Sequence, residues 1–408
     1  MLLFLFFFVW RLFDLLIAFI IPRFIPYLGF FPYGEIFKEY GLPTFISSFA
    51  NFDGAQYLTL VREGYNTYTQ AYFPLYFLLV KAVALLFPTP GAIRAHNDML
   101  SAVLVSNVCF VLGLIMFKKY LKTMIPVETG HAPSLHKNNN AILWTMLFLL
   151  LFPTSFFFGA VYTEGLFFFL CIGSLYFLKE KNYWLAGLFA ALSSATRLMG
   201  IFLIIPFFIS QMSKIKGQKL KSKIKSFKML SFVFSPLMGF LLYAGYLWKT
   251  VGDPLFFFRV QPVFGANRST NLILLPQVYF RYLKIFFTAN WNFQYFISLV
   301  EFVIFSFVFI ILILDLIKNF STKSRSPFGR KLINYERIAL NIFSFINLIL
   351  PTLTGTFSSI PRYSLMSLSF FLFLGEMKNK QVKTLIAILF FILHMVLLGF
   401  FIQGYFVG

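Results

Sequence analysis

The chain has 408 residues, of which 59% are hydrophobic and only 12% are charged. Soluble domains contain about 45–50% apolar residues, so this composition excludes a water-soluble globular protein. The formal net charge of +21 comes from cations that lie between the apolar runs, and no nucleic-acid-binding motif accompanies them. We therefore expect contacts with the headgroups of membrane lipids and no nucleic-acid partner.

Apolar runs of about 15–20 residues recur along the chain, which is the length that crosses the hydrocarbon core as a helix. They predict an all-α polytopic membrane protein with about 10–12 transmembrane helices, in a single domain over residues 1–408. The predicted spans lie near 2–22, 73–87, 99–117, 141–158, 162–178, 229–248, 296–317, 338–350, 361–375 and 384–403, with a shorter pair at 183–196 and 198–210.

Basic segments predict the orientation of these spans. Residues 211–228 hold seven lysines and no acid, and residues 318–337 hold six Lys or Arg against Glu336. Because cytoplasmic loops carry an excess of Lys and Arg, we expect these segments to face the cytoplasm. Residues 23–72 and 249–295 then form two outward loops.

One conflict remains in this topology. If residues 23–72 face outward, full crossings at 73–87 and 99–117 place Lys118 on the outer side, although Lys118, Lys119 and Lys122 mark the cytoplasmic side. Either a segment there is re-entrant or the charge rule fails locally.

The stretch NFDGAQYLTLVREGY, residues 51–65, is polar for its surroundings. Asn51 as N-cap and Gly64 as C′ residue predict one short helix between them. Asp53, Gln56 and Tyr57 then share a face. This face either lines a cleft at headgroup level, or Asp53 merely stabilises the helix N-terminus by about 0.3–1 kcal/mol.

This stretch, followed by AYFPLYFLL (71–79), resembles the signature of the glycosylphosphatidylinositol mannosyltransferase 2 (PIG-V-like) family and its bacterial relatives. Further blocks resemble those of the family in the same order: VYTEGLFFFL (161–170), SATRLMGIFL (194–203), VGDPLFFFRVQ (251–261) and SSIPRYSLMSLSFFLFLG (358–375). Phe52, Thr163 and the pair Leu198-Met199 depart from the family pattern, which has Trp, Ser and Ser-Asn there.

The resemblance implies a GT-C-type helical bundle with an outward first loop that carries short interfacial helices. It also implies an inverting glycosyltransferase that moves a sugar, mannose in the family, from a polyprenyl-phosphate donor to a lipid or glycan hydroxyl on the non-cytoplasmic face. Such a reaction needs an ionised carboxylate to deprotonate the acceptor, and Asp53 is the candidate general base.

The departing lipid phosphate needs cations, and Arg197 and Arg362 lie at the outward ends of apolar segments. A guanidinium makes planar bidentate contacts with phosphate, so we predict that both bind the donor. The alternative is that each arginine extends to the lipid headgroups. Tyr363 is expected to add a hydroxyl hydrogen bond to the substrate.

Other candidate substrate-binding residues have simpler alternatives. Gln56 and Tyr57 are candidates because they share the face of Asp53. Glu164 either bonds sugar hydroxyls, holds Arg197 in place, or is a solvated turn residue. Asp253 stands in a Gly-Asp-Pro sequence, which indicates a turn first and a substrate contact second. Arg11 and Asp14, three residues apart, predict an ion pair inside the first span.

The four histidines and two cysteines show no ligand spacing. We therefore expect no metal held by protein ligands alone, although a divalent cation that bridges Asp53 and a phosphate remains open. The absence of a Gly-rich phosphate loop argues against a nucleotide-sugar donor.

The main alternative function is a transporter or flippase of lipid-linked sugars, which we disfavour because no repeated half is visible. The short loops favour a bacterial or archaeal plasma membrane with an outward active site, over the eukaryotic endoplasmic reticulum. A partner subunit is neither indicated nor excluded.

Overall fold

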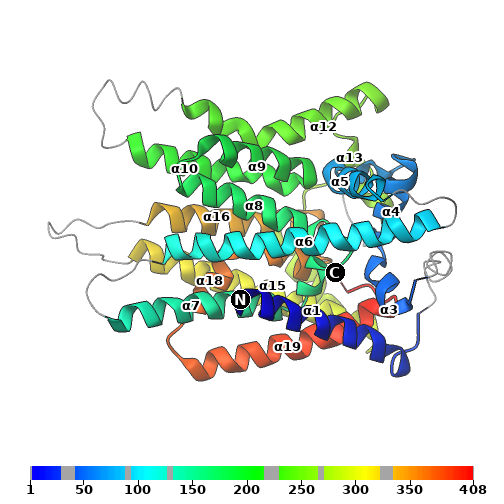
Figure 1. Ribbon diagram of the computed structural model, residues 1–408. Helices are drawn as coiled ribbons and strands as arrows, with labels where there is room; N and C mark the ends of the chain where they lie inside the picture. Colours follow the sequence, from blue (N-terminus) through cyan, green and yellow to red (C-terminus); the bar gives the residue numbers. More distant parts are fainter. Residues whose placement is uncertain are drawn as a thin grey trace.

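The computed structural model describes residues 2–28, 42–87, 93–125, 132–215, 229–264, 271–321 and 334–407. Within these ranges the regular structure is entirely helical, and no strand is present (Figure 1). The predicted class, an all-α polytopic membrane protein, is confirmed. Large parts of the two lysine-rich segments, 216–228 and 322–333, and residues 29–41 of the predicted first loop lie outside the described residues.

Five helices in the described part are long and apolar enough to cross a membrane, where the sequence predicted about 10–12 spans. They are α1 (Leu2–Ile20), α6 (Ile93–Met124), α15 (Phe293–Ser321), α16 (Tyr335–Ile349) continued by η8 (Leu350–Thr354), and α19 (Lys380–Ile402). Other helices pack among them: α7 (Ala132–Leu151), α8 (Glu164–Lys179), α9 (Tyr183–Thr196), α10 (Ile204–Ile215), α12 (Ser235–Val251) and α18 (Leu368–Glu376).

Short elements gather at one end of this bundle, at the right in Figure 1. The first predicted loop supplies η1 (Ile21–Arg23), α3 (Thr44–Ser47), η2 (Ser48–Ala50), α4 (Asp53–Glu63) and η3 (Thr69–Ala71), and the second supplies α13 (Phe256–Arg259), η7 (Gln261–Phe264) and α14 (Leu275–Thr288). Short helical segments elsewhere are η4 (Ser155–Phe158), η5 (Leu198–Leu203), η6 (Met229–Phe234), α17 (Ile360–Tyr363) and η9 (Ser364–Met366).

The conflict over Lys118 disappears because only one helix crosses there. Helix α5 (Pro74–Leu85) has 12 residues, about 18 Å, and it lies beside α4 at the right end of the bundle (Figure 1). The Asn97 side chain at the start of α6 donates to Ala84 O (2.8 Å), at the end of α5. Of α5 and α6, only α6 runs the length of the molecule. The predicted span 73–87 is therefore a short helix at one end of the bundle.

Basic residues meet at the opposite end of the bundle. Lys119 near the end of α6 lies 6.0 Å from the Tyr176 ring of α8. Lys179, the last residue of α8, pairs with Glu336 at the start of α16. Lys119 and Lys179 therefore lie at the same end of the bundle, as the charge pattern predicted.

A buried ion network ties three helices together near this end. Asp315 of α15 is fully buried and accepts from Arg337 of α16 (Nη2 to Oδ1, 2.8 Å) and from Ser369 of α18 (2.5 Å). Breaking such a buried pair costs about 3–5 kcal/mol. The network holds α18 in place. It thereby also fixes the C-terminal end of the segment that runs from α17 to α18.

The predicted ion pair of the first span is present. Arg11 Nη1 lies 3.7 Å from Asp14 Oδ2. Asp14 also contacts His394 of α19 (Oδ1 to Nε2, 2.8 Å), and the other ring nitrogen of His394 lies 3.1 Å from Ser155 Oγ. These contacts join α1, α19 and η4.

Candidate active site

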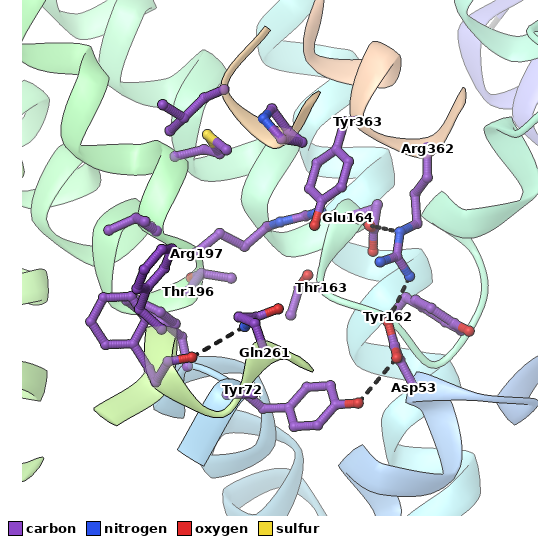
Figure 2. A pocket seen from close by; sticks show the side chains of 18 of the residues that line it. Asp53, Tyr72, Tyr162, Thr163, Glu164, Thr196, Arg197, Gln261, Arg362 and Tyr363 are labelled. Carbon is purple, nitrogen blue, oxygen red and sulfur yellow. Dashed lines mark hydrogen bonds and ion pairs between the residues drawn. The ribbon is translucent and has the colours of Figure 1, made fainter. Parts of the chain in front are cut away.

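A pocket of about 240 Å³ lies at the end of the bundle opposite the basic residues. Its polar residues come from element ends: Asp53 begins α4, Glu164 begins α8, and Arg197 directly follows α9. Arg362 and Tyr363 belong to α17. Six of the eight predicted site residues line this one pocket: Asp53, Tyr57, Glu164, Arg197, Arg362 and Tyr363 (Figure 2).

Four charged side chains form a chain of alternating sign across the pocket. Arg362 Nη1 lies 2.7 Å from Asp53 Oδ2, and Arg362 Nε lies 3.4 Å from Glu164 Oε1. The same Glu164 oxygen lies 2.6 Å from Arg197 Nη1. Two carboxylates and two guanidiniums therefore neutralise one another, and Glu164 bridges both arginines.

The four charged side chains differ in how deeply they are buried, and this difference bears on the roles predicted for each of them. The side chains of Glu164 and Arg362 are 1% and 8% exposed, and that of Arg197 is 13% exposed. Neither arginine extends to the surface, and Glu164 is no solvated turn residue; of its three predicted roles, the contacts support holding Arg197. Asp53, at 31%, is the most accessible of the four.

Tyr72 orients the Asp53 carboxylate, a contact that the sequence analysis did not single out. Its hydroxyl donates to Asp53 Oδ1 (3.1 Å), while Arg362 holds the other carboxylate oxygen (Figure 2). Burial, and then the charge of Asp53, raises the pKa of Tyr72 well above its ordinary value, so the hydroxyl keeps its proton and donates. Tyr72 falls within the block AYFPLYFLL, which was the only signal for it.

The start of α4 differs from the prediction. Asn51 is not the N-cap: its side chain donates to Phe401 O (2.7 Å) at the end of α19, and the helix begins after Phe52. Phe52 has φ 58°, a conformation that costs a non-glycine residue about 1–3 kcal/mol. Its ring packs against Phe401 and Phe406, with centroids 6.0 and 5.3 Å away. Contacts with the C-terminal segment thus hold the backbone that presents Asp53.

Tyr363 packs between the two arginines of the pocket. The guanidinium carbon of Arg197 lies 5.0 Å from its ring centroid, and that of Arg362 lies 5.7 Å away. A guanidinium near an aromatic ring is stabilised by about 0.5–2 kcal/mol. The ring of Tyr363 therefore helps to place both cations, in addition to any role of its hydroxyl.

Gln56 and Asp253 lie outside the lining of this pocket. Gln56 is half-buried on α4. Asp253 accepts from Leu255 N (3.0 Å) and pairs with Arg259 (3.1 Å), after Gly252 with φ 78°. These contacts are those of the turn that the Gly-Asp-Pro sequence indicated first.

One wall of the pocket is apolar and comes from η5, the α13 region and η8. Within this wall Phe258 is 42% exposed, whereas Phe257 is 5% exposed. Its residues are Leu198, Met199, Phe257, Phe258, Leu350 and Pro351. The pocket therefore offers charged groups on one side and hydrocarbon on the other.

Protein ligands for a metal are not assembled in the described ranges, where no three His, Cys, Asp or Glu side chains come together. The cationic side chains of the pocket lining are Arg197 and Arg362, each paired with a carboxylate.

Comparison with known proteins identifies the family of the chain. No curated protein and no solved structure matches the chain significantly. The family model described as mannosyltransferase (PIG-V) matches residues 3–251, more than half of the chain. The matched range includes Asp53, Glu164 and Arg197 and ends before Arg362. With this match and a helical membrane fold around the pocket, the chain belongs to the PIG-V mannosyltransferase family and is a membrane glycosyltransferase.

Proposed function

We propose that this enzyme transfers mannose from a polyprenyl-phosphate donor to a hydroxyl of a lipid or glycan acceptor, with inversion at the anomeric carbon. The observation that carries the proposal is the convergence of Asp53, Arg197 and Arg362 in one pocket, from three separate segments of the chain. Each of these residue types supplies one requirement of the reaction.

Asp53 is the proposed general base. Tyr72 and Arg362 each hold one oxygen of its carboxylate. The side chain is 31% exposed and lines the pocket, so an acceptor hydroxyl can approach it there. The pairing with Arg362 keeps the carboxylate ionised, as a base must be.

In this reaction the acceptor oxygen attacks the anomeric carbon while its proton passes to Asp53. The bond from that carbon to the phosphate oxygen breaks, and its electron pair stays on the departing polyprenyl phosphate. The negative charge that develops there is best stabilised by preorganised cations. Arg197 supports this role because its hydrogen bond to Glu164 leaves N–H donors of its fork for an anion.

The remaining lining supports a sugar with a lipid carrier. Glu164 Oε2 is buried and accepts no hydrogen bond from the described residues, so a sugar hydroxyl would satisfy it. The apolar wall that includes Phe258 and Leu350 suits the first isoprene units of a polyprenyl chain.

The basic end of the bundle supports an outward-facing active site. Because Lys and Arg mark the cytoplasmic side, Lys119 and Lys179 assign their end of the helices to the cytoplasm. The pocket at the other end then opens toward the non-cytoplasmic face. We retain a bacterial or archaeal plasma membrane as the proposed location.

Reconstituted protein with radiolabelled polyprenyl-phosphate mannose and extracted lipids tests the proposal. Asp53→Asn should lower the rate of mannose transfer by about 10²–10⁴-fold, the usual contribution of a general base. The variant should still fold, so its elution profile in size-exclusion chromatography should match that of the unmodified protein. Glu63→Gln, an exposed carboxylate at the other end of α4, is the matched control and should retain activity.

Two outcomes would reject the proposal. Full activity of Asp53→Asn removes Asp53 as base. Movement of the labelled donor across the bilayer without mannose transfer indicates the alternative, a flippase of lipid-linked sugars.

A further inference from the structure

The turn that leads into α17 has an unusual backbone. Ser359, directly before α17, has φ 66°, and Gly355 at the start of the turn has φ 94°. Glycine adopts such angles readily, but a serine does so at a cost. The Ser359 hydroxyl is buried and has no hydrogen-bond partner in the described part of the chain. Its own side chain therefore does not stabilise the left-handed conformation.

Contacts from two other helices surround this turn. Phe357 N donates to the Tyr282 hydroxyl of α14 (3.0 Å), which also lies 3.2 Å from Thr356 Oγ1. The Tyr282 hydroxyl donates in turn to Glu301 Oε2 of α15 (2.6 Å). The Tyr282 phenol thus binds the turn directly before Ser359, and the Glu301 carboxylate holds that phenol.

Glu301 is an unexpected residue at this position. It is 4% exposed on a helix of high hydropathy, and Tyr282 is 5% exposed. A carboxylate buried in such a place is costly and usually has a function. No counterion is paired with it among the described residues, and it lies outside the lining of the pocket. Its hydrogen-bond partner in the described part of the chain is Tyr282.

The conformation of Ser359 determines where Arg362 points. The amides of Arg362 and Tyr363 both donate to Ser359 O (3.1 Å each), which forms the first turn of α17. Arg362 then reaches Asp53 at 2.7 Å (Figure 2). A change in φ at Ser359 would rotate α17 and separate this pair.

We propose that Glu301 and Tyr282 are positioning residues of the active site: they hold Ser359 in its left-handed conformation and thereby place Arg362 against Asp53. The expected effect of Glu301 and Tyr282 on turnover rests on the proposed function. Their expected effect on the backbone conformation of Ser359 is independent of it.

General packing of α14 against α15 is the alternative explanation, and the chain offers a matched control for it. The Tyr279 hydroxyl lies 2.9 Å from Ser306 Oγ across the same pair of helices. Tyr279→Phe therefore removes a similar hydroxyl contact between α14 and α15. It leaves the contacts of Tyr282 with Glu301 and with the turn in place.

Hydrogen exchange of the reconstituted protein, measured by mass spectrometry, tests the backbone. The amides of Arg362 and Tyr363 are the reporters, because they bond Ser359 and neither Tyr282 nor Glu301. Tyr282→Phe and Glu301→Leu should each speed their exchange about 10-fold, which corresponds to one net hydrogen bond. Tyr279→Phe should not. The proposal would be overturned if the reporter amides exchanged at the same rate in Tyr279→Phe and Tyr282→Phe, or if neither variant changed their exchange rate.

Ser359→Gly supplies a rescue that simple loss of packing would not show. Glycine accepts φ 66° without strain, so Ser359→Gly should restore slow exchange when combined with Tyr282→Phe. In the mannose-transfer assay, Tyr282→Phe should lower kcat about 10-fold, and Ser359→Gly should recover most of this loss.

The two measurements separate the two proposals. If the unmodified protein transfers no mannose, the proposed function fails while exchange still decides the role of Glu301 and Tyr282. If transfer is present but Tyr282→Phe changes neither exchange nor kcat, only the positioning role is refuted.

Discussion

Replacing Glu164 with glutamine is the sharpest test of the charge chain in the pocket, because this one carboxylate serves two arginines. Its Oε1 lies 2.6 Å from Arg197 Nη1 and 3.4 Å from Arg362 Nε. Glutamine has nearly the same size and still accepts hydrogen bonds. The substitution therefore removes charge with little change in packing.

The magnitude follows from the distances. At an effective dielectric constant of about 20, unit charges at these separations attract by about 6 and about 5 kcal/mol. The net loss of unfolding free energy is smaller, because the guanidinium charge is delocalised and the hydrogen bond is retained. We expect about 3–5 kcal/mol, which is typical of a broken buried pair. With an unfolding entropy of about 2.1 cal/mol/K per residue, this loss lowers the Tm by about 4–6 °C.

Thermal unfolding in mild detergent measures this shift. Glu336→Gln is the matched control, since Glu336 is 47% exposed and pairs with Lys179 at the basic end. An exposed pair contributes about 0–1 kcal/mol, so this control should unfold within about 1 °C of the unmodified protein. A Glu164→Gln protein as stable as the control would refute the reasoning that the buried chain of charges holds the pocket together.

Three further predictions concern activity in the mannose-transfer assay. Arg362→Lys should raise the donor KM about 10-fold, because an ammonium cannot replace a planar fork that faces two carboxylates; an unchanged KM contradicts a role of the fork in donor binding. Tyr72→Phe should lower kcat about 10-fold through loss of a hydrogen bond to the charged Asp53, and turnover at the unmodified rate would show that this hydroxyl does not orient the base. Asp253→Asn should keep activity within about twofold, as expected for a surface residue, and a large loss would return Asp253 to the list of substrate contacts.

Some residues of the site could be predicted from the sequence because they are charged residues in a mostly apolar chain. Glu164, Arg197 and Arg362 each border an apolar run, and Asp53 lies in a polar stretch between two such runs. A charge beside an apolar run is expensive enough to indicate a function. The structure brings these four together in one pocket. Tyr72 lacked this contrast, since an aromatic residue beside Phe73 and Tyr76 looks like ordinary apolar packing.

Local patterns misled where a distant partner decided the conformation. Asn51 has the residue type of an N-cap, but its amide is used by backbone carbonyls of α19 about 350 residues later. The run 73–87 is apolar like a span, yet its helix ends after 12 residues at the edge of the bundle. Helix α14 was hidden within a segment predicted as a loop, although it packs against α15.

Composition by itself determined that this protein is helical and embedded in a membrane. These properties depend on transfer from water to lipid, which acts on each segment separately. Only the tertiary structure decided which charges pair, that Tyr72 turns Asp53 toward its pocket, and that Glu301 supports the turn before Arg362. Such contacts join residues far apart in the chain, and their energies depend on distances of a few ångströms that no local pattern encodes.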